Sequence, residues 1–459
     1  MSPLPPRRNL QHSRYLVVGL GISGLWAARM LSRMGADVTV SETRLESELG
    51  NALCREIRDL GAVLETGGHR EESFLNTEAI IISPGVPHDM EMLERARKKD
   101  IPVIGELEFA SHFIDTPVIA VTGTNGKSTV VSFIGCLLEN AGLEVFVGGN
   151  IGTPLTAFAA GEKRADYLVL EVSSFQLDTI ETFSPFVSII LNISPDHLDR
   201  YRDYEAYAQS KLRIFENQGS GQHLIINDED KILSSLTLES GVSVFRYGKY
   251  KLEGRNAFIE NDRIMTFMDG KKNASFSFRS FSLPGSHNLE NLMAGILAGQ
   301  LLDIDVSNIQ KTIDEFKGLP DRQELVGEFK GVLFYNDSKA TNIDSAVRSL
   351  LTFNRPLILI AGGRHKGSDY YPLLKAAEKN VKQAVFIGEA KEMLASSFKG
   401  VIPCRTAEDM DCAVSAAFSV ADPGDVVLLA PACSSFDMFS DYSQRGMAYR
   451  SAVERLYRG

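Results

Sequence analysis

The chain has 459 residues, enough for about three domains of ordinary size. A hydrophobic content of 44% and a charged content of 23% are typical of a soluble globular protein. The net charge of −11 argues against a nucleic-acid-binding protein, and no apolar run is long enough to span a membrane. The five cysteines are scattered and never spaced as C-x-x-C, which fits a reducing cytoplasm and predicts neither a disulfide framework nor a zinc knuckle.

A tail and a small α/β domain are predicted at the N-terminus. The tail, residues 1–14, carries basic residues without the apolar stretch of a signal peptide, so we expect it to be disordered. The domain ends at residue 105, where the composition changes. Its predicted strands lie at residues 15–18, 36–41, 79–87 and 101–105.

A glycine-rich turn follows the first of these strands. Gly19-Leu20-Gly21-Ile22-Ser23-Gly24 matches the G-x-G-x-x-G pattern, opens an Ala- and Leu-rich helix, and is followed by Glu42 at the end of the second strand. This arrangement is typical of dinucleotide binding in a Rossmann-like domain. By itself it favours an NAD(P)-dependent oxidoreductase, and that alternative stays open at this point.

A second glycine-rich loop, Thr122-Gly123-Thr124-Asn125-Gly126-Lys127-Ser128-Thr129, lies between an apolar strand (residues 118–121) and an apolar helix (residues 129–138). Backbone N–H groups and the helix N-terminus can face a phosphate there, Lys127 adds a positive charge, and Ser128 can reach Mg²⁺. Val121 stands where the strict pattern has its first glycine. The alternative is an ordinary turn with a surface lysine, but the flanking elements favour ATP binding.

The rest of the chain repeats the strand–helix alternation in two further domains. The central domain (residues 106–318) is predicted to contain a parallel sheet covered on both faces, followed by a small antiparallel addition at residues 242–283 and a helix from residue 285 to 302. The last domain (residues 319–459) is expected to be Rossmann-like, with strands at residues 333–336, 357–361, 384–387 and 426–430.

Three charged or polar side chains of the central domain are candidates for chemistry. Glu171 lies in an apolar strand, where a carboxylate is costly unless it is paired or holds a metal such as Mg²⁺; a salt bridge to a lysine is the alternative. His197 lies in the polar loop after the next strand. Lys211 shares a face of the predicted helix 203–215 with Tyr204 and Tyr207, which would lower its pKa. Spacing alone favours an ammonium that reaches water along the tyrosines.

Four polar segments of the last domain coincide with the linker or with strand ends, where ligands bind in open α/β sheets. Arg322 could bind a phosphate or any carboxylate. The loops Asn336–Asn342 and Ala361–Gly367 are apt for an anion. In the segment Pro431–Asp437, Cys433 has no histidine nearby and is interpreted as a structural thiol.

Taken together, these segments resemble the Mur ligase family. The resemblance covers nearly the whole chain after the tail. It is carried by TGTNGKST, the Glu171 strand, NISPDHLDRY, the helical Lys211, GSHNLENLMA, DSKATN and PACSSFD. The DSKATN motif at residues 337–342 favours the members that add D-glutamate to UDP-N-acetylmuramoyl-L-alanine. The DNPR signature of the members that add a diamino acid is absent from the sequence.

The resemblance implies a cytoplasmic ligase of peptidoglycan synthesis, and so of cell-wall biogenesis, cell shape and cell division. It implies three domains that bind the UDP-sugar, ATP and the amino acid, and an acyl-phosphate intermediate. We expect a monomer with neither nucleic acid nor membrane insertion. Two Mg²⁺ ions are implied, the first at Ser128 and Glu171 and the second at His197 and a carbamylated Lys211. The catalytic residues that the resemblance implies are Lys127, Glu171, His197 and Lys211.

The remaining roles also follow from the resemblance. It assigns ATP to Gly123, Thr124, Asn125, Gly126, Lys127, Ser128, Thr129, Asn288, Asn291, Arg322, Asp337 and Lys339. It assigns the UDP substrate to Ile22, Ser23, Thr43, Arg44, Ser83, Asn150, Ser173 and Gln176. The first glycine motif is then expected to bind UDP and not NAD. D-Glutamate has two carboxylates, which we assign to Thr341, Lys366, Ser435, Phe436 and Tyr442. The chain departs from the family pattern at Asp321, usually His, and at Ile343, where Pro is common.

Overall fold

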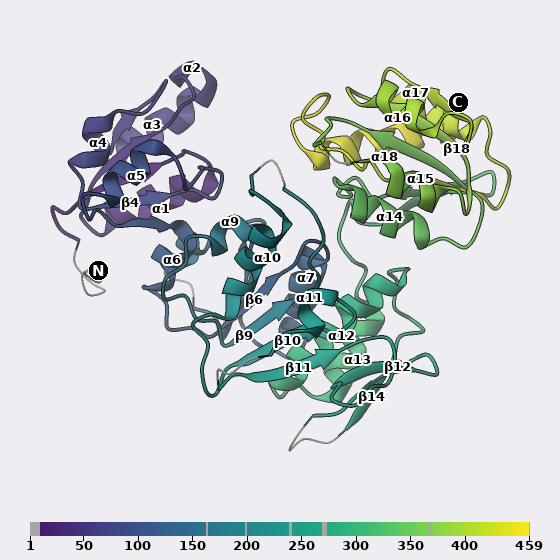
Figure 1. Cartoon of the computed structure of the whole chain (residues 1–459), viewed down its shortest axis with the longest axis horizontal. Coiled ribbons are helices and arrows are strands. Elements are labelled where there is room, and N and C mark those ends of the chain that lie inside the picture. Colours follow the sequence, from purple (N-terminus) through teal and green to yellow (C-terminus); the bar gives the residue numbers. More distant parts are fainter. Residues whose placement is uncertain are drawn as a thin grey trace.

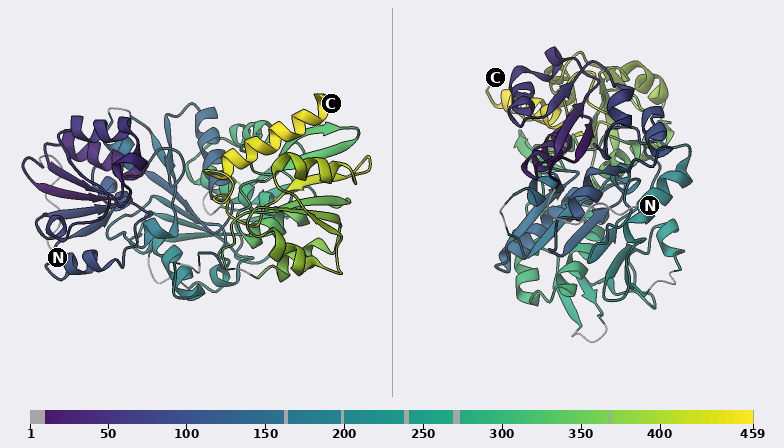
Figure 2. Two further views of the ribbon diagram at one scale, coloured as in Figure 1. Left: turned by 90° about the horizontal axis from the view of Figure 1, so that it is seen from above. Right: turned by 90° about the vertical axis from the view of Figure 1, so that its left-hand side faces the viewer.

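The computed structural model describes residues 10–161, 164–197, 200–237, 241–268, 273–367 and 369–458. Its strands form three sheets that follow one another along the chain. Figure 1 shows the N-terminal and C-terminal parts on opposite sides of the middle part, and the view from above in Figure 2 agrees. The three sheets confirm the α/β class and the serial arrangement. The boundaries at residues 105 and 318 lie between sheets and remain predictions.

The first sheet is parallel, with the strand order β3-β2-β1-β4-β5. Its strands are β1 (Arg14–Val18), β2 (Asp37–Ser41), β3 (Val63–Glu65), β4 (Ala79–Ile82) and β5 (Val103–Gly105). The helices of this part are α1 (Ile22–Arg33), α2 (Glu46–Leu49), α3 (Asn51–Asp59), α4 (Glu71–Leu75) and α5 (Glu91–Arg97).

Two expectations for this first part are wrong. Leu10 is buried in the core beside β1, which begins at Arg14, so the disordered tail does not extend to residue 14. Residues 1–9 lie outside the described residues. The sheet also has an additional strand, β3, which has only three residues and lies at an edge, where no continuous apolar run is required.

The middle sheet contains six parallel strands followed by an antiparallel extension, in the order β14-β13-β12-β11-β10-β9-β6-β8-β7. The parallel strands are β6 (Val118–Thr122), β7 (Val145–Gly149), β8 (Tyr167–Glu171), β9 (Val187–Ile190), β10 (His223–Asn227) and β11 (Ser243–Tyr247). The extension consists of β12 (Ala257–Glu260), β13 (Arg263–Thr266) and β14 (Ala274–Ser277). The β12–β13 and β13–β14 pairs are antiparallel, whereas β12 still pairs in parallel with β11. The antiparallel addition is therefore real but begins after β11, which still pairs in parallel with β10.

Helices cover both faces of this middle sheet, as the continuous apolar strands predicted. One face packs against α7 (Lys127–Asn140), α12 (Ser286–Leu301) and α13 (Val306–Glu315). The other packs against α6 (Glu106–Ser111), α8 (Leu155–Ala159), α9 (Ser174–Leu177), α10 (Tyr204–Leu212) and α11 (Lys231–Ser234). A short 3₁₀ turn (Arg213–Phe215) follows α10.

The last sheet has the order β15-β16-β20-β17-β18-β19, with only β15 antiparallel to its neighbour. Its strands are β15 (Glu324–Phe329), β16 (Val332–Asn336), β17 (Leu357–Gly362), β18 (Val381–Ile387), β19 (Cys404–Thr406) and β20 (Val426–Leu429). Helices α14 (Ile343–Leu351), α15 (Tyr371–Ala377) and α16 (Lys391–Phe398) cover one face, and α17 (Met410–Phe418) and α18 (Tyr442–Arg458) cover the other. The two edge strands were not expected.

Candidate active site

The phosphate loop is fixed by the end of a neighbouring strand. Helix α7 begins at Lys127, directly after Gly126. The φ of Gly126 is 91°, in the left-handed region that glycine adopts freely. The Thr124 N–H donates to the carbonyl of Asn192 (2.9 Å), and the Asn125 N–H donates to its side-chain oxygen (2.9 Å). The Lys127 ammonium donates to the carbonyls of Gly123 (2.8 Å) and Thr124 (2.9 Å). The loop thus has the strand–turn–helix arrangement that the sequence predicts, and its role as a phosphate cradle stays a prediction.

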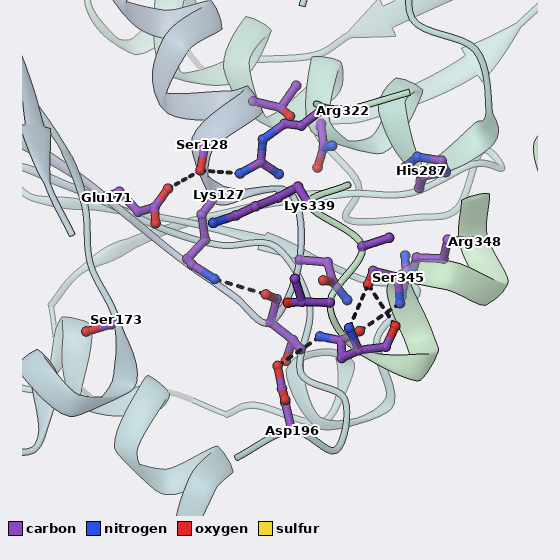
Figure 3. A pocket seen from close by; sticks show the side chains of 18 of the residues that line it. Lys127, Ser128, Glu171, Ser173, Asp196, His287, Arg322, Lys339, Ser345 and Arg348 are labelled. Carbon is purple, nitrogen blue, oxygen red and sulfur yellow. Dashed lines mark hydrogen bonds between the residues drawn. The ribbon is translucent and has the colours of Figure 1, made fainter. Parts of the chain in front are cut away.

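A chain of polar groups leads from Glu171 to the last domain. The Ser128 hydroxyl donates to one oxygen of the buried Glu171 carboxylate, and Asn150 donates to the other (2.9 Å). Arg322 reaches Ser128 from beyond the linker (2.5 Å), so Ser128 lies between Glu171 and Arg322 in Figure 3. Burial raises the pKa of Glu171, but the Lys127 ammonium and the two hydrogen bonds outweigh it and lower the pKa overall. The carboxylate is therefore charged without a direct salt bridge to a lysine.

Lys211 lies inside the site and not at the surface. Its relative exposure is 2%, its ammonium donates to the carbonyl of Gly123 (2.9 Å), and it lies 4.7 Å from the centre of the Tyr207 ring. Burial, with the nearby Lys127 charge, lowers the pKa of Lys211 well below its usual value. The interpretation that its ammonium reaches water is wrong, because the Tyr207 face of α10 is turned towards the phosphate loop.

His197 occupies a strained position beside these groups. Its φ of 54° is unusual for a residue with a side chain. Its ring packs against Phe175, 5.0 Å between centres, and its Nε2 lies 3.8 Å from the carboxylate of Asp196. Burial lowers the pKa of His197 against the opposing effect of Asp196, which favours a neutral imidazole able to act as a ligand.

The last domain closes the other side of the site. Asn342 caps helix α14 and donates to Asp196 of the middle domain (2.8 Å). Asp344, in the first turn of α14, accepts from Asn125 of the phosphate loop (2.7 Å) and from Ser194 (3.1 Å). The Lys339 ammonium lies 3.8 Å from the centre of the Tyr442 ring. Burial raises the pKa of Asp337 to about 6 and lowers that of Lys339 to about 8.

These groups surround one cavity of about 330 Å³ between the middle and last domains. Eighteen of the residues singled out from the sequence line it: Thr124, Asn125, Gly126, Lys127, Ser128, Thr129, Asn150, Glu171, Ser173, His197, Lys211, Asn288, Asn291, Arg322, Asp337, Lys339, Thr341 and Lys366. Gly123 contributes its carbonyl to Lys127 and Lys211 without lining the cavity. The structure thus brings residues together that are more than two hundred positions apart.

The residues assigned to the UDP substrate mostly lie elsewhere. Ile22 and Ser23 begin α1, Thr43 and Arg44 follow β2, and Ser83 follows β4, where its hydroxyl donates to the Gly19 carbonyl (2.8 Å). Ile22 is 58% exposed. Gln176 is in the capping box of α9 and lines a second, small pocket together with Ser83.

Glu42 has the position that would bind the ribose in a dinucleotide site. Its Oε2 accepts from the Leu20 N–H (2.7 Å) and from the Arg44 guanidinium (2.9 Å). Arg44 also donates to the Leu20 carbonyl (3.0 Å). Burial raises the pKa of Glu42, but these partners lower it to about 2. The carboxylate is therefore committed to the glycine turn, which weakens the dinucleotide interpretation.

The second half of the amino-acid assignment lies outside the main cavity. Of the described residues lining it, none is Ser435, Phe436 or Tyr442. Ser435 is buried and Phe436 is 63% exposed. Tyr442 contacts the cavity residue Lys339, whose ammonium lies over its ring, and its carbonyl accepts from the Ser338 hydroxyl (2.8 Å). Thr341 and Lys366 lie in the cavity wall, and the roles of the other three residues remain predictions.

Sequence reasoning missed several residues in the cavity wall, notably Asp196, His287 and Arg348. Asp196 directly precedes His197 in the same polar loop, which is a signal that could have been used. His287 immediately precedes Asn288 at the start of α12. Arg348 lies on an amphipathic helix, where its charge resembles that of any solvent-exposed residue, so its sequence context gives no signal.

The residues around Ser128 fit a Mg²⁺ ion. Among the described residues, no three His, Cys, Asp or Glu side chains cluster in a way that could hold a metal. The Ser128 hydroxyl and the Glu171 carboxylate are nevertheless hydrogen-bonded, so both oxygens can approach one cation, and such hard oxygen ligands suit Mg²⁺. Near Lys211 the fit is conditional, because an ammonium repels a cation and only an anionic derivative would attract it.

Comparisons with known proteins agree with this architecture. The models of the Mur ligase MurD-like N-terminal domain, the Mur ligase middle domain and the Mur ligase glutamate ligase domain match residues 13–105, 121–299 and 321–433. Of the helices in the described residues, none combines the length and apolar character that crossing a bilayer requires.

Two relatives and one solved structure show which proteins the chain is similar to. The chain is 44% identical to a UDP-N-acetylmuramoylalanine--D-glutamate ligase of Desulfosudis oleivorans over 98% of both chains. It is 43% identical to the enzyme of that name in Desulfatibacillum aliphaticivorans over 98% of this chain and 99% of the relative. The UDP-N-acetylmuramate-alanine ligase of Thermotoga maritima shares the fold (TM-score 0.59, 20% identity, 97% and 100% coverage). The expected resemblance is confirmed, and the chain belongs to the Mur ligase family.

Proposed function

We propose that this protein is the cytoplasmic ligase that joins D-glutamate to UDP-N-acetylmuramoyl-L-alanine at the expense of ATP. The observation that carries the proposal is the shared cavity. The phosphate loop and Glu171 form one wall, and the segment with Asp337, Lys339 and Thr341 forms the other. The names of relatives 44% and 43% identical to the chain support this choice of amino acid and acceptor.

In the first step, a carboxylate oxygen of the acceptor attacks the γ-phosphorus of ATP, the bond to the bridging oxygen breaks, and ADP leaves. The protein's contribution is positioning and neutralisation of charge. Lys127 donates to two carbonyls of its own loop, so a phosphate oxygen can replace either of them at little cost. Arg322, already in contact with Ser128, supplies a second cation from the opposite domain.

In the second step, the amine of D-glutamate attacks the carbonyl carbon of the acyl phosphate and phosphate leaves from the tetrahedral intermediate. The amine must be neutral, so the protein must hold the amino acid by its carboxylates. Lys366 and Thr341 line the cavity on the side of the last domain and would bind one of them. Ser435, with N–H groups near Phe436 and Tyr442, would bind the other after these loops move towards the cavity.

Two Mg²⁺ ions would be held by Ser128 with Glu171, and by His197 with Lys211. When bound they would neutralise the phosphates and the acceptor carboxylate. Burial favours the neutral amine of Lys211, and a neutral amine is the form that combines with CO₂ to give a carbamate. As a carbamate, Lys211 would present oxygens and a negative charge where its ammonium would repel the ion. We propose a monomer that acts on these small molecules alone.

The reaction class is tested by phosphate release. We expect ATP turnover only when UDP-N-acetylmuramoyl-L-alanine and D-glutamate are both present, with ADP, phosphate and the dipeptide product in equal amounts. Titrations with ATP, UDP and NADH test the oxidoreductase alternative in the same preparation. Tight binding of NADH without any response to ATP would overturn the proposal, and preference for an L-amino acid or a diamino acid would overturn the choice of substrate.

The amino-acid assignment is tested with Lys366→Ala. Losing a charge-assisted hydrogen bond of about 1.5–3 kcal/mol should raise the KM for D-glutamate at least about tenfold. The KM values for ATP and the UDP-sugar should stay close to those of the wild type. Lys379→Ala, which removes an exposed lysine of the same domain, is the control. If Lys366→Ala instead weakens ATP and leaves D-glutamate unchanged, the pocket is misassigned.

A further inference from the structure

The residues assigned to the UDP-sugar do not include a free cation for its diphosphate. Among them only Arg44 is basic, and its guanidinium is paired with Glu42 (2.9 Å) and donates to the Leu20 carbonyl (3.0 Å). A diphosphate carries two negative charges and is normally bound by backbone N–H groups together with at least one arginine or lysine. A positive group between the first and middle domains would add to the attraction that the glycine turn and the N-terminus of α1 can offer the diphosphate.

Arg200 is such a group. It belongs to the loop after β9 in the middle domain, yet its Nη1 donates to the carbonyl of Gly85 in the first domain (3.3 Å). Its guanidinium lies 4.6 Å from the centre of the Phe175 ring at the start of α9. In the described part of the chain, no carboxylate forms an ion pair with Arg200. Its guanidinium is therefore held across the domain boundary, and towards the described residues it donates no other side-chain hydrogen bond.

The surroundings of Arg200 suit an anion attached to the UDP-sugar. Arg200 lines the small pocket between the loop after β4 and helix α9, together with Ser83 and Gln176, two residues already assigned to that substrate. Of the described residues lining the pocket, only Glu106 is acidic. One of its oxygens accepts from the Thr156 N–H and hydroxyl (2.8 Å each), so this oxygen is engaged within the middle domain.

We propose that Arg200 binds the diphosphate of the nucleotide-sugar substrate and holds it between the first and middle domains. This inference rests on the proposed function for the identity of the substrate. The guanidinium stays stacked on Phe175, and a phosphate oxygen takes the place of the Gly85 carbonyl as acceptor. Arg200 is a binding residue in this role, since it does not touch the carboxylate that reacts.

The experiment compares UDP with uridine, which differ only by the diphosphate, in calorimetric titrations of the full-length protein. For Arg200→Gln we expect UDP affinity to fall about tenfold, with uridine affinity unchanged. Arg202→Gln is the matched control. Its side chain is 85% exposed, pairs with Asp203 and does not line the pocket. It should leave both affinities as in the wild type. Thermal unfolding of the variants reports on the fold.

Each outcome separates this inference from the proposed function. If Arg200→Gln keeps the wild-type ratio of UDP to uridine affinity, or weakens both ligands equally, Arg200 does not bind the diphosphate even when ligase activity is present. If the ratio falls only in Arg200→Gln but no substrate combination consumes ATP, Arg200 is confirmed as a diphosphate ligand and the proposed reaction is wrong. A wild-type protein that does not distinguish UDP from uridine overturns the inference.

Discussion

At the scale of single residues, Lys211 has the most unusual environment. Its ammonium is buried beside Lys127 with a backbone carbonyl as its hydrogen-bond acceptor. Two cations this close are costly, and conversion of one to a carbamate would remove the repulsion. This environment supports the carbamate that we propose at Lys211.

Replacing Lys211 tests this role. We expect Lys211→Ala to lose nearly all turnover and to regain part of it when a short-chain carboxylate is added, because the added anion can take the place of the carbamate. Lys231→Ala, an exposed lysine at the start of α11, should retain full activity and should not respond to the carboxylate. An undiminished Lys211→Ala enzyme would show that the lysine has only a packing role.

Asp337 makes stability depend on pH. Its pKa is raised, chiefly by burial, from 3.8 to about 6. Protonation therefore favours the folded state, and this contribution, at most about 3 kcal/mol, is lost as the pH rises through 6. The wild type should lose this contribution between pH 5 and pH 7.5, whereas Asp337→Asn has no such titration. The Tm of the variant minus the Tm of the wild type should therefore increase over this pH range. A difference in Tm that stays constant over this range would contradict the assignment.

The sequence predicted many residues of the site, but it did not predict the residues of helix α14 that contact them. Lys127, Ser128 and Glu171 could be found because each breaks an apolar or glycine-rich local pattern. Asp344 and Arg348 could not, since an acidic residue in the first turn and a basic residue in the last turn are ordinary features of any helix. Their importance arises only from a tertiary contact, which periodicity does not encode.

At the scale of elements, helix α7 has a glycine with positive φ near each end. Gly126, before its first residue, and Gly142, after its last, have φ values of 91° and 84°. A Cβ at Gly126 would lie 2.4 Å from the side-chain oxygen of Asn291, whereas a Cβ at Gly142 would meet nothing within 4 Å. The two positions share a positive φ, which is unfavourable for any residue with a Cβ, and they differ in the clash with Asn291.

This pair gives a controlled prediction. Both Gly126→Ala and Gly142→Ala should lower stability by about 1–2 kcal/mol because an L-residue disfavours positive φ. Only Gly126→Ala should also raise the KM for ATP at least about tenfold, since it displaces Asn291 from the cavity wall. Steady-state kinetics and thermal unfolding of both variants measure the two effects separately. Equal KM values for ATP in the two variants would show that Asn291 does not contribute to nucleotide binding.

The strands that the sequence missed have a common cause. β3 and β19 have three residues each and lie at sheet edges, and β7 is an edge strand that ends in two glycines. The irregular β15 contains Gly327 and a register shift beside it. Central parallel strands are buried on both faces and show continuous apolar runs, whereas edge strands need neither the length nor the apolarity. The central strands of each sheet were predictable for this reason, and these four edge strands were not.

At the scale of the whole molecule, a few hydrogen bonds join the last domain to the phosphate loop. One oxygen of Asp344 accepts from Asn125 and Ser194 in the middle domain and from Arg348 in its own helix. Asn342 adds a bond to Asp196. Hydrogen bonds to charged groups contribute about 1.5–3 kcal/mol each, so these few bonds hold the last domain against the middle domain.

Asp344→Ala should therefore shift the molecule towards a more open arrangement. We expect a larger radius of gyration in small-angle X-ray scattering without ligands, and kcat/KM values for ATP and D-glutamate reduced about tenfold. Glu392→Ala removes an acidic residue from the first turn of α16, away from the interface, and should change neither quantity. Unaltered scattering together with wild-type kinetics would show that Asp344 does not hold the domains together.

The cavity between these domains also shapes how fast a nucleotide arrives. It is lined by six lysine and arginine side chains and three carboxylates, although the whole chain carries a net charge of −11. At physiological ionic strength the Debye length is about 8 Å. An approaching polyanion is therefore repelled only weakly by the negative protein surface, and it is attracted by the basic side chains only when it is close to the cavity. Added salt weakens both effects at once. Capture of ATP should consequently be much less sensitive to ionic strength than capture by a protein with an open basic face.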